Sequence, residues 1–260
     1  QQGSMDDSIV VHQAGRVRRI VLNRPDKLNA ITTAMGERLF SEINGAVEDD
    51  GVGVIVISGA GRAFSAGADM KEGGVDNRDV LRAPSDMATN RAKVAEIMRV
   101  WAAPKPIIAQ VHGYCIGSAN DVVAVADLIV CGESARFGMP EARQFALPPT
   151  LGFWPFRIGL AKTKELLYTG RFVGGTEAAA IGLASDVVAD GSLAEHVDAL
   201  ATTIAEVPSD RLAVVKQAAN SWFEVLGLPQ AALRGAEYHA IYHQASEWAA
   251  RGDQQSPEPS

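Results

Sequence analysis

The stretch Gly113-Tyr-Cys-Ile-Gly-Ser-Ala-Asn-Asp121, which continues as VVAVADLIV to Val130, decides the fold prediction. It follows a short apolar strand predicted at residues 106–111 and leads into a helix that opens near Gly117 or Ser118. The first amides of such a helix have no intrahelical acceptor, so they can bind a negatively charged oxygen. A helix that starts there places Asp121 one turn beyond Ser118, on the same side as these amides. The segment therefore predicts an anion site with a carboxylate beside it.

Two further segments can contribute to this site. After a buried strand predicted at residues 52–58, the run from Gly59 to Glu72 is rich in small residues, whose peptide N–H groups can approach a ligand closely. Glu141 follows a short strand and a proline-fixed bend. Amides from two loops suit a thioester oxygen that gains charge when a proton moves at the adjacent carbon, and two carboxylates can activate water and donate a proton. From spacing alone, structural roles for both acids remain open, because an acid near a helix start often only complements the dipole.

Around these segments, the first half of the chain alternates strands and helices. Strands are predicted at residues 9–13 and 17–22, and helices at residues 32–48, capped by Thr32, and 87–101. From Lys162 onward the chain is mainly helical. This order predicts an α/β core followed by a helical region. Further predicted boundaries are strands at residues 128–131 and 135–137, N-caps at Thr176 and Ser209, and helix ends at Gly170, Gly182 and Gly227.

Composition narrows the class of protein. The 260 residues are 47% hydrophobic and 21% charged, as in an ordinary globular protein, and the chain, with a net charge of −7, lacks the basic clusters that bind nucleic acid. Two cysteines, Cys115 and Cys131, cannot form a disulfide framework, so we expect a reducing, cytoplasmic location. No apolar run approaches the roughly 20 residues that span a bilayer, so no membrane partner is expected.

The expected division of the chain has four parts. Residues 5–200 form the catalytic core and residues 201–252 a helical region for oligomerisation. Residues 1–4 precede Met5 and are interpreted as a tag remnant. The polar tail at residues 253–260, with two prolines, is expected to be disordered.

Several motifs, taken together and in order, resemble the signatures of the enoyl-CoA hydratase/isomerase (crotonase) superfamily. The resemblance implies a spiral of ββα units, with C-terminal helices that assemble a homotrimer or a dimer of trimers. It also implies an acyl-coenzyme A thioester as substrate and no separate cofactor, since coenzyme A is part of the substrate. The motifs are NRPDKLNAI (Asn23 to Ile31), FSAGADMKE (Phe64 to Glu72), GYCIGSANDVVAVADLIV (Gly113 to Val130), ARFGMPEAR (Ala135 to Arg143), KELLYTGR (Lys164 to Arg171) and AAAIGLASDVV (Ala178 to Val188).

The same resemblance implies roles for individual residues. The backbone N–H groups of Ala68 and Ser118 would form the oxyanion hole, and Asp121 and Glu141 match the two acidic positions of the hydratases. We therefore expect an enoyl-CoA hydratase, with an isomerase or another crotonase reaction as the alternative. A non-catalytic acyl-CoA-binding protein is the main alternative of another class. Expected substrate-binding residues are Ala66, Asp69 and Gly117 in the two loops, and Lys71, Arg24 and Lys27 near the phosphates of coenzyme A.

This sequence departs from the family pattern at several places, among them the C-terminus, which lacks the basic ending with an aromatic residue that is frequent among relatives. The hydratases have glutamate where Asp121 stands, and a run of glycines where Ser118 and Ala119 stand. Aspartate is one methylene shorter, and a misplacement of ~1 Å can cost about a hundredfold in rate. The segment at residues 144–154 lacks paired glycines and carries bulky side chains, which predicts an unusual acyl group.

Other motifs were weighed against this interpretation. Cys115 stands at the centre of a possible nucleophile elbow, which would indicate a thiol hydrolase, but packing is the simpler role. His239 and His243 are four residues apart and could bind a metal, yet no third ligand is evident, so a hydrated helix face and no metal are expected. The glycines near Gly59 and the lysine Lys162 do not complete a nucleotide-binding loop.

Overall fold

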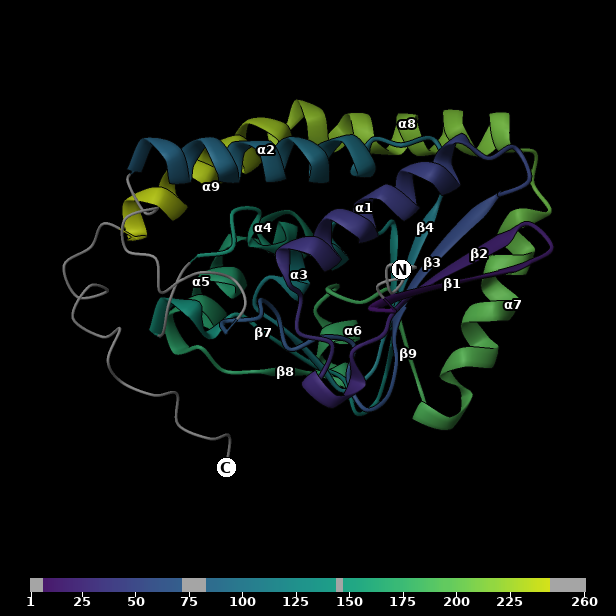
Figure 1. The fold of residues 1–260 in the computed structure, drawn as a ribbon, viewed down its shortest axis with the longest axis horizontal. Coiled ribbons are helices and arrows are strands. Elements are labelled where there is room, and N and C mark those ends of the chain that lie inside the picture. The colour runs from purple at the N-terminus through teal and green to yellow at the C-terminus, as the bar shows by residue number, and fades with distance from the viewer. Residues whose placement is uncertain (1–6, 72–82, 144–146, 244–260) are drawn as a thin grey trace, which may run out of the picture.

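The computed structural model of the chain describes residues 7–71, 83–143 and 147–243, which build two β-sheets surrounded by helices (Figure 1). In the larger sheet, β1 and β2 are antiparallel and every other neighbouring pair is parallel. Apolar residues fill β3 and β4 because both faces of these central strands are covered. The strand order is β1 (Ile9–Ala14), β2 (Val17–Leu22), β3 (Val54–Gly59), β4 (Ile107–Val111), β6 (Leu128–Gly132) and β9 (Asp186–Val188).

The smaller sheet continues directly from β4, because β5 begins three residues after β4 ends. It has the order β5 (Tyr114–Ile116), β7 (Arg136–Gly138) and β8 (Val173–Gly174), with β5 and β7 parallel and β8 antiparallel to β7. The predicted strand boundaries agree with β1, β2, β3, β4, β6 and β7 to within two residues. β5, β8 and β9 were not predicted, because they have only two or three residues each.

The helices follow the predicted alternation of strands and helices, with differences at their ends. Thr32 caps the first long helix by accepting a hydrogen bond from the Met35 N–H at 3.1 Å, as predicted. The predicted N-caps Thr176 and Ser209 are each displaced, because Gly174 and Pro208 occupy the cap positions. The helices are α1 (Thr33–Glu48), α2 (Ala83–Trp101), α3 (Ala119–Ala124), α4 (Trp154–Arg157), α5 (Leu160–Thr169), α6 (Gly175–Ala180), α7 (Leu193–Ala205), α8 (Ser209–Val225) and α9 (Leu228–His243), with 3-10 turns η1 (Pro25–Lys27), η2 (Pro140–Arg143), η3 (Leu151–Phe153) and η4 (Asp190–Ser192).

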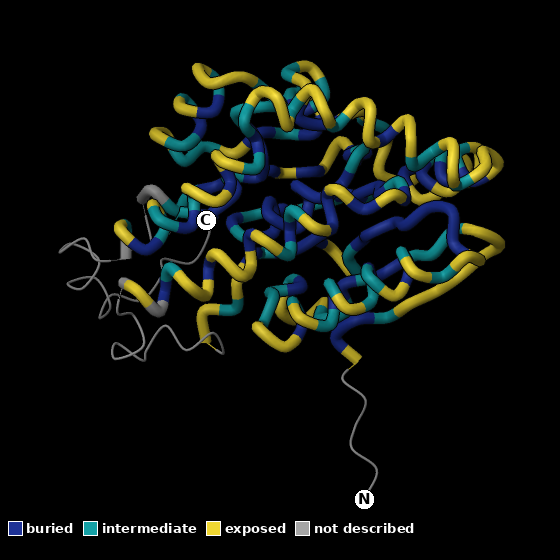
Figure 2. The backbone as a smooth tube through the Cα atoms, turned by 90° about the horizontal axis from the view of Figure 1, so that it is seen from above, coloured by how far each residue is buried: buried dark blue, intermediate teal, exposed yellow. Residues whose placement is uncertain are grey.

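The hydrophobic core lies on both faces of the larger sheet, and Figure 2 shows buried backbone in the interior of the molecule, with exposed positions on the outer turns of the surrounding helices. On one face, Val197 and Ala201 of α7 pack in a cluster with Val54 and Val56 of β3. On the other face, the main cluster includes the buried side of α1 and the apolar residues of α3. This arrangement confirms an α/β fold with helices at its C-terminal end.

The last two helices, α8 and α9, lie beside α2 along one side of the molecule (Figure 1). They fall within the helical region expected at residues 201–252. The expected tag remnant at residues 1–4 and the expected tail at residues 253–260 lie outside the described residues.

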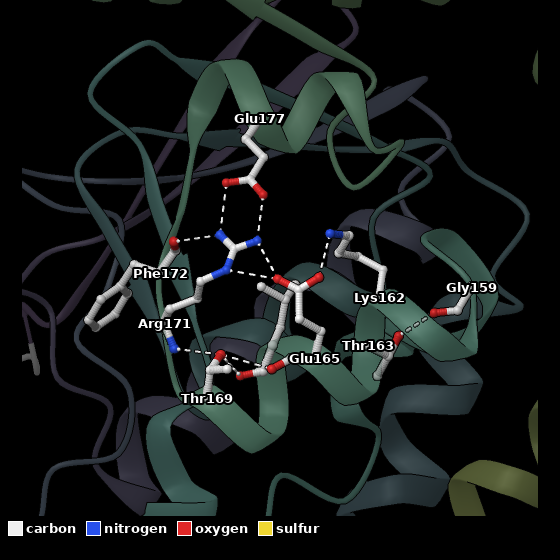
Figure 3. A network of polar contacts seen from close by, with 9 residues as sticks. Gly159, Lys162, Thr163, Glu165, Thr169, Arg171, Phe172 and Glu177 are labelled. Carbon is white, nitrogen blue, oxygen red and sulfur yellow. Dashed lines mark hydrogen bonds and ion pairs between the residues drawn. The ribbon is translucent and has the colours of Figure 1, made fainter.

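An ion-pair network on the surface fixes the arrangement of α5, β8 and α6 (Figure 3). The Arg171 guanidinium donates to both carboxylate oxygens of Glu177, at 2.8 and 3.0 Å, and to Glu165 at 2.7 and 3.0 Å. Lys162 donates to the other oxygen of Glu165. Two carboxylates on one arginine raise the pKa of Arg171 and give the pairs a fixed, forked geometry. The network braces the edge of the smaller sheet and does not reach the site described below.

Candidate active site

The two segments rich in small residues lie side by side, as the sequence suggested. Backbone hydrogen bonds join them: the Ser65 N–H donates to the Tyr114 carbonyl at 2.9 Å, and the Ile116 N–H donates to the Ser65 carbonyl at 3.1 Å. Gly67 has φ of 92°, and a Cβ there would lie 2.6 Å from the Ile116 carbonyl oxygen. Glycine is therefore required where the loops meet.

This junction brings together the amides of Ala68 and Ser118. A Cβ atom placed on Gly67 would lie 3.5 Å from the Ser118 backbone nitrogen, and Ala68 is the residue that follows Gly67. Neither the Ala68 nor the Ser118 N–H donates a backbone hydrogen bond to any other residue in the described parts of the chain. Two neighbouring N–H donors without acceptors are suited to bind an oxygen that carries negative charge.

Arg24 and Asp69 brace the loop that carries Ala68. The Arg24 guanidinium donates to Asp69 Oδ2 at 2.9 Å and to the Ala30 carbonyl at 2.6 Å. The Asp69 N–H donates to the Ile31 carbonyl at 2.9 Å. Arg24 was expected near the phosphates of coenzyme A; its side chain is 18% exposed and pairs with Asp69. In the structure, this ion pair holds the loop beside Ala68.

Glu141, on the turn η2, places its carboxylate against Gly117. A Cβ at Gly117 would lie 2.2 Å from Glu141 Oε1, and φ of 58° independently favours glycine there. The other carboxylate oxygen, Oε2, is buried and has no hydrogen-bond partner among the described residues. A buried carboxyl oxygen without a partner beside two free amides is a candidate proton donor or acceptor.

Asp121 lies in the first turn of α3, as predicted, and its side chain is buried. Its Oδ1 accepts a hydrogen bond from the Thr150 hydroxyl and lies 3.3 Å from the Thr150 backbone nitrogen. Thr150 caps the turn η3, which lies 29 residues further along the chain. Asp121 is thus fixed from two sides, by its own helix and by a distant turn.

The environments of the two acids separate their pKa values. Burial raises the pKa of Asp121 to about 6, against the hydrogen bonds from Thr150 that lower it. Burial raises the pKa of Glu141 further, to about 8, and the neighbouring charge of Asp121 adds to this effect. Burial dominates at both acids, and α3, with six residues, has little dipole to offer.

Asn120 and Thr150 also belong to this site and were not predicted from the sequence. The Asn120 side-chain amide donates to the Gly117 carbonyl at 3.1 Å and to the Gly138 carbonyl at 3.0 Å, so it fixes the loop before Ser118. A polar residue one position before Asp121 on a helix otherwise composed of apolar residues was a weak signal for Asn120. For Thr150 the local sequence carried no such signal.

The other expected substrate-binding residues remain predictions. The Ala66 N–H already donates to the Leu28 carbonyl at 2.9 Å, so a contact to the adenine end would need its carbonyl or methyl group. Lys27 and Lys71 are exposed near the same loops. Of the bulky segment at residues 144–154, residues 144–146 lie outside the described residues.

The described part of that segment forms one wall of an apolar groove, and α9 forms the other wall. Thr150 belongs to this groove and also bonds Asp121, so the groove adjoins the acid. Its lining includes Leu147, Leu151, Phe153, Leu228, Ala232 and Tyr238.

The competing interpretations find no support in the geometry. Cys115 is fully buried, and burial raises the pKa of its thiol, so it has neither the access nor the thiolate of a nucleophile. His239 does not lie on a hydrated helix face as expected, because its ring Nδ1 lies 2.5 Å from the Leu147 carbonyl oxygen. The side chain of His243 lies outside the described residues.

No helix in the described ranges is both long enough and apolar enough to cross a membrane.

Comparison with known proteins identifies the family. The family model described as enoyl-CoA hydratase/isomerase matches residues 12–251. The chain belongs to the enoyl-CoA hydratase/isomerase (crotonase) family. It is 33% identical over 224 residues to a protein of Mycobacterium bovis named "probable enoyl-CoA hydratase", which covers 84% of this chain and 83% of that protein.

Two other relatives of this crotonase-family enzyme are informative. A solved structure, a probable enoyl-CoA hydratase from Mycobacterium thermoresistibile, superposes with a TM-score of 0.85 at 30% identity, covering 92% of this chain and 97% of that one. The 1,2-epoxyphenylacetyl-CoA isomerase of Escherichia coli is 30% identical over 220 residues, covering 84% of this chain and 83% of that protein. Hydratases and an isomerase thus stand at similar distances from this chain.

Proposed function

We propose that this crotonase-family enzyme is an enoyl-CoA hydratase. The observation that carries the proposal is the pairing of the buried carboxyl group of Asp121 with the partly buried one of Glu141, which differ in pKa, beside the two free amides of Ala68 and Ser118. At neutral pH, Asp121 is then mainly ionised and can act as a base, while Glu141 is mainly protonated and can act as an acid.

The proposed mechanism adds water across the double bond and accounts for the transfer of each proton and electron pair. Asp121 takes a proton from water, and the water oxygen bonds to the β-carbon of the enoyl thioester. The double-bond electrons move toward the thioester, whose oxygen becomes negative and accepts hydrogen bonds from Ala68 and Ser118. Glu141 then gives its proton to the α-carbon. The product is a 3-hydroxyacyl thioester, and the proton on Asp121 returns to Glu141 through solvent.

Isomerisation is the alternative reaction, and the position of Glu141 favours it as a second candidate. A single carboxyl group beside the oxyanion amides can remove a proton from one carbon and return it to another, which shifts the double bond without water. The isomerase relative acts, by its name, on an epoxide, so it supports isomerase chemistry in this family but not double-bond migration in particular. A non-catalytic acyl-CoA-binding role would leave the buried, unpartnered Glu141 oxygen without a purpose.

The first experiment is incubation of the purified protein with 2-enoyl, 3-enoyl and 3-hydroxyacyl thioesters of coenzyme A, followed by mass analysis of the products. A hydratase adds one molecule of water to the 2-enoyl substrate and raises its mass by that amount. Turnover of the 3-enoyl substrate at unchanged mass would identify the isomerase instead. Binding without any product, in a protein that is folded by circular dichroism, would leave the non-catalytic role.

We also propose that the enzyme assembles as a homotrimer or a dimer of trimers. Five large apolar side chains on α8 and directly after its end are exposed. A monomer rarely leaves such a cluster uncovered. These residues are Val214, Val215, Trp222, Val225 and Leu226, with exposed fractions from 65 to 87%.

Light scattering at micromolar concentration should give three or six times the mass of one chain. Trp222→Glu, which places a charge within the exposed α8 cluster, should reduce the mass. Thr203→Glu, at an exposed position of α7, should leave the mass unchanged. A wild-type protein with the mass of one chain would contradict the proposal.

A further inference from the structure

Thr150 makes a close contact with the Asp121 carboxylate. Its hydroxyl donates to Asp121 Oδ1, and its backbone nitrogen lies 3.3 Å from the same oxygen. Thr150 is 6% exposed and Asp121 is 9% exposed, so water competes little for this bond. Hydrogen bonds to a charged group in such surroundings are stronger than those between neutral groups.

The direction of the Thr150 hydroxyl proton follows from a second hydrogen bond. The Gly152 N–H donates to Thr150 Oγ1 at 3.1 Å, so that bond uses a lone pair of the hydroxyl oxygen. The hydroxyl proton is then directed to Asp121. A donor whose orientation is fixed in this way stabilises the ionised carboxylate more than a freely rotating hydroxyl does.

The turn that carries Thr150 is itself strained. Leu151, Gly152 and Phe153 have φ of 49°, 58° and 57°, and two of these residues are not glycine. Consecutive left-handed residues persist only where the surroundings impose them, and they concentrate at functional sites. Here Phe153 and the following Trp154 are buried, with 3% and 1% exposure.

The strained turn also packs against the helix that carries the acid. A Cβ at Gly152 would lie 3.0 Å from the Cβ of Asn120, the residue before Asp121. The backbone of the turn therefore fixes the distance between Thr150 and α3.

We propose that Thr150 is a positioning residue for hydration, which holds the Asp121 carboxylate in its ionised form and in the orientation that faces water. This inference rests on the hydratase function proposed above. It also explains how an aspartate can stand where the hydratases have a glutamate. The aspartate side chain is one methylene shorter, and the strained turn brings the Thr150 hydroxyl close enough to fix the orientation of its carboxylate oxygens.

The pH dependence of hydration is the direct readout. Hydration requires ionised Asp121 and protonated Glu141, so the rate should fall below about pH 6 and above about pH 8. Charged groups that act on Asp121 are Lys93 of α2, which lowers its pKa, and Glu141, whose ionisation is coupled to it. A hydroxyl bond to the carboxylate lowers its pKa. Removal of that bond should therefore raise the pKa and move the acid limb to higher pH.

The test compares Thr150→Val with the wild type. The acid limb of kcat/KM should move upward by about one pH unit, and the rate below the limb should fall about tenfold. The alkaline limb and the exchange of the substrate α-proton with deuterated solvent, both of which depend on Glu141, should remain. Thr150→Ser, which keeps a hydroxyl, should restore most of the acid limb.

A matched control is Thr163→Val on α5. Thr163 is 1% exposed, and its hydroxyl donates to the Gly159 carbonyl at 2.8 Å, outside the site (Figure 3). This variant loses a buried hydroxyl bond of the same kind but should keep the wild-type pH profile. An equal shift in both variants would mean a general loss of packing and would contradict the proposal.

A second measurement does not depend on turnover. Carbon-13 NMR of the labelled aspartate carboxyl groups, with Asp121 assigned from Asp121→Asn, should show its titration displaced to higher pH in Thr150→Val. An unchanged titration and an unchanged acid limb would overturn the role of Thr150. A displaced titration in a protein that hydrates no enoyl thioester would contradict the hydratase function and leave the contact with Asp121 supported. If the valine variant does not fold, Thr150→Ala takes its place in both measurements.

Discussion

Glu141→Gln should abolish hydration and, with it, the exchange of the substrate α-proton with deuterated solvent. The loss should be about a hundredfold to ten-thousandfold, the usual contribution of a positioned general acid. Glutamine has nearly the same shape and fits against Gly117, but its amide cannot give a proton to carbon. Because Glu141 Oε2 has no hydrogen-bond partner among the described residues, the substitution breaks no internal contact of that oxygen.

Asp121→Asn is the comparison that separates the two acids. It should depress hydration, because no base remains to take the proton from water, yet leave measurable α-proton exchange or double-bond migration through Glu141. Single-turnover assays in deuterated solvent, with products analysed by mass, measure both reactions. Exchange that survives in Glu141→Gln and disappears in Asp121→Asn would reverse the assignment. Normal turnover in both variants would exclude a catalytic role for either acid.

The pH dependence of the melting temperature of Glu141→Gln tests the raised pKa of Glu141 without relying on activity. Burial raises the folded-state pKa of Glu141 from 4.5 to about 8, so the native protein binds this proton more tightly than the unfolded chain. The wild type therefore loses stability as pH rises from about 4.5 to about 8, and glutamine removes that loss. The melting temperature of the glutamine variant, relative to that of the wild type at the same pH, should therefore be higher at pH 8 than at pH 5.

Ser118→Pro should lower kcat/KM by about a hundredfold to a thousandfold, because it removes one of the two amide donors proposed for the thioester oxygen. The backbone φ of Ser118 is −62°, which proline adopts without strain. Its N–H donates no backbone hydrogen bond to another described residue, so none of these bonds is lost. Proline also places its ring where the oxygen would bind, which adds to the effect.

Ser118→Ala is the matched control, since it keeps the amide and loses only a side chain that makes no capping hydrogen bond. It should retain most of the activity. Circular dichroism and thermal melting establish that both variants are folded. If the proline variant is not folded, a complex of the wild type with a non-hydrolysable acyl-CoA analogue decides the point. A thioester oxygen far beyond hydrogen-bond distance of both Ala68 and Ser118 would exclude this oxyanion hole.

Local patterns in the sequence determined much of the scaffold. The apolar run VIVIS predicts β3 as a buried central strand, because both of its faces need cover. Thr32 marks the start of α1 by a hydrogen bond that spans only three residues. The family motifs place Ala68 in a loop, Ser118 and Asp121 at the start of a helix, and Glu141 in a turn. In each case the signal lies within a few neighbouring residues, so it can be seen without the fold.

The tertiary structure decided the chemistry of the site. Burial separates the pKa values of Asp121 and Glu141, and burial is the sum of contacts with residues distant in the chain. The Thr150 hydroxyl reaches Asp121 across 29 residues, and Arg24 reaches Asp69 across 45. The strands β5 and β8 are too short to show a period, and only their pairing with β7 reveals them. Sequence periodicity reports local backbone geometry, whereas desolvation and long-range hydrogen bonds exist only after the chain has folded.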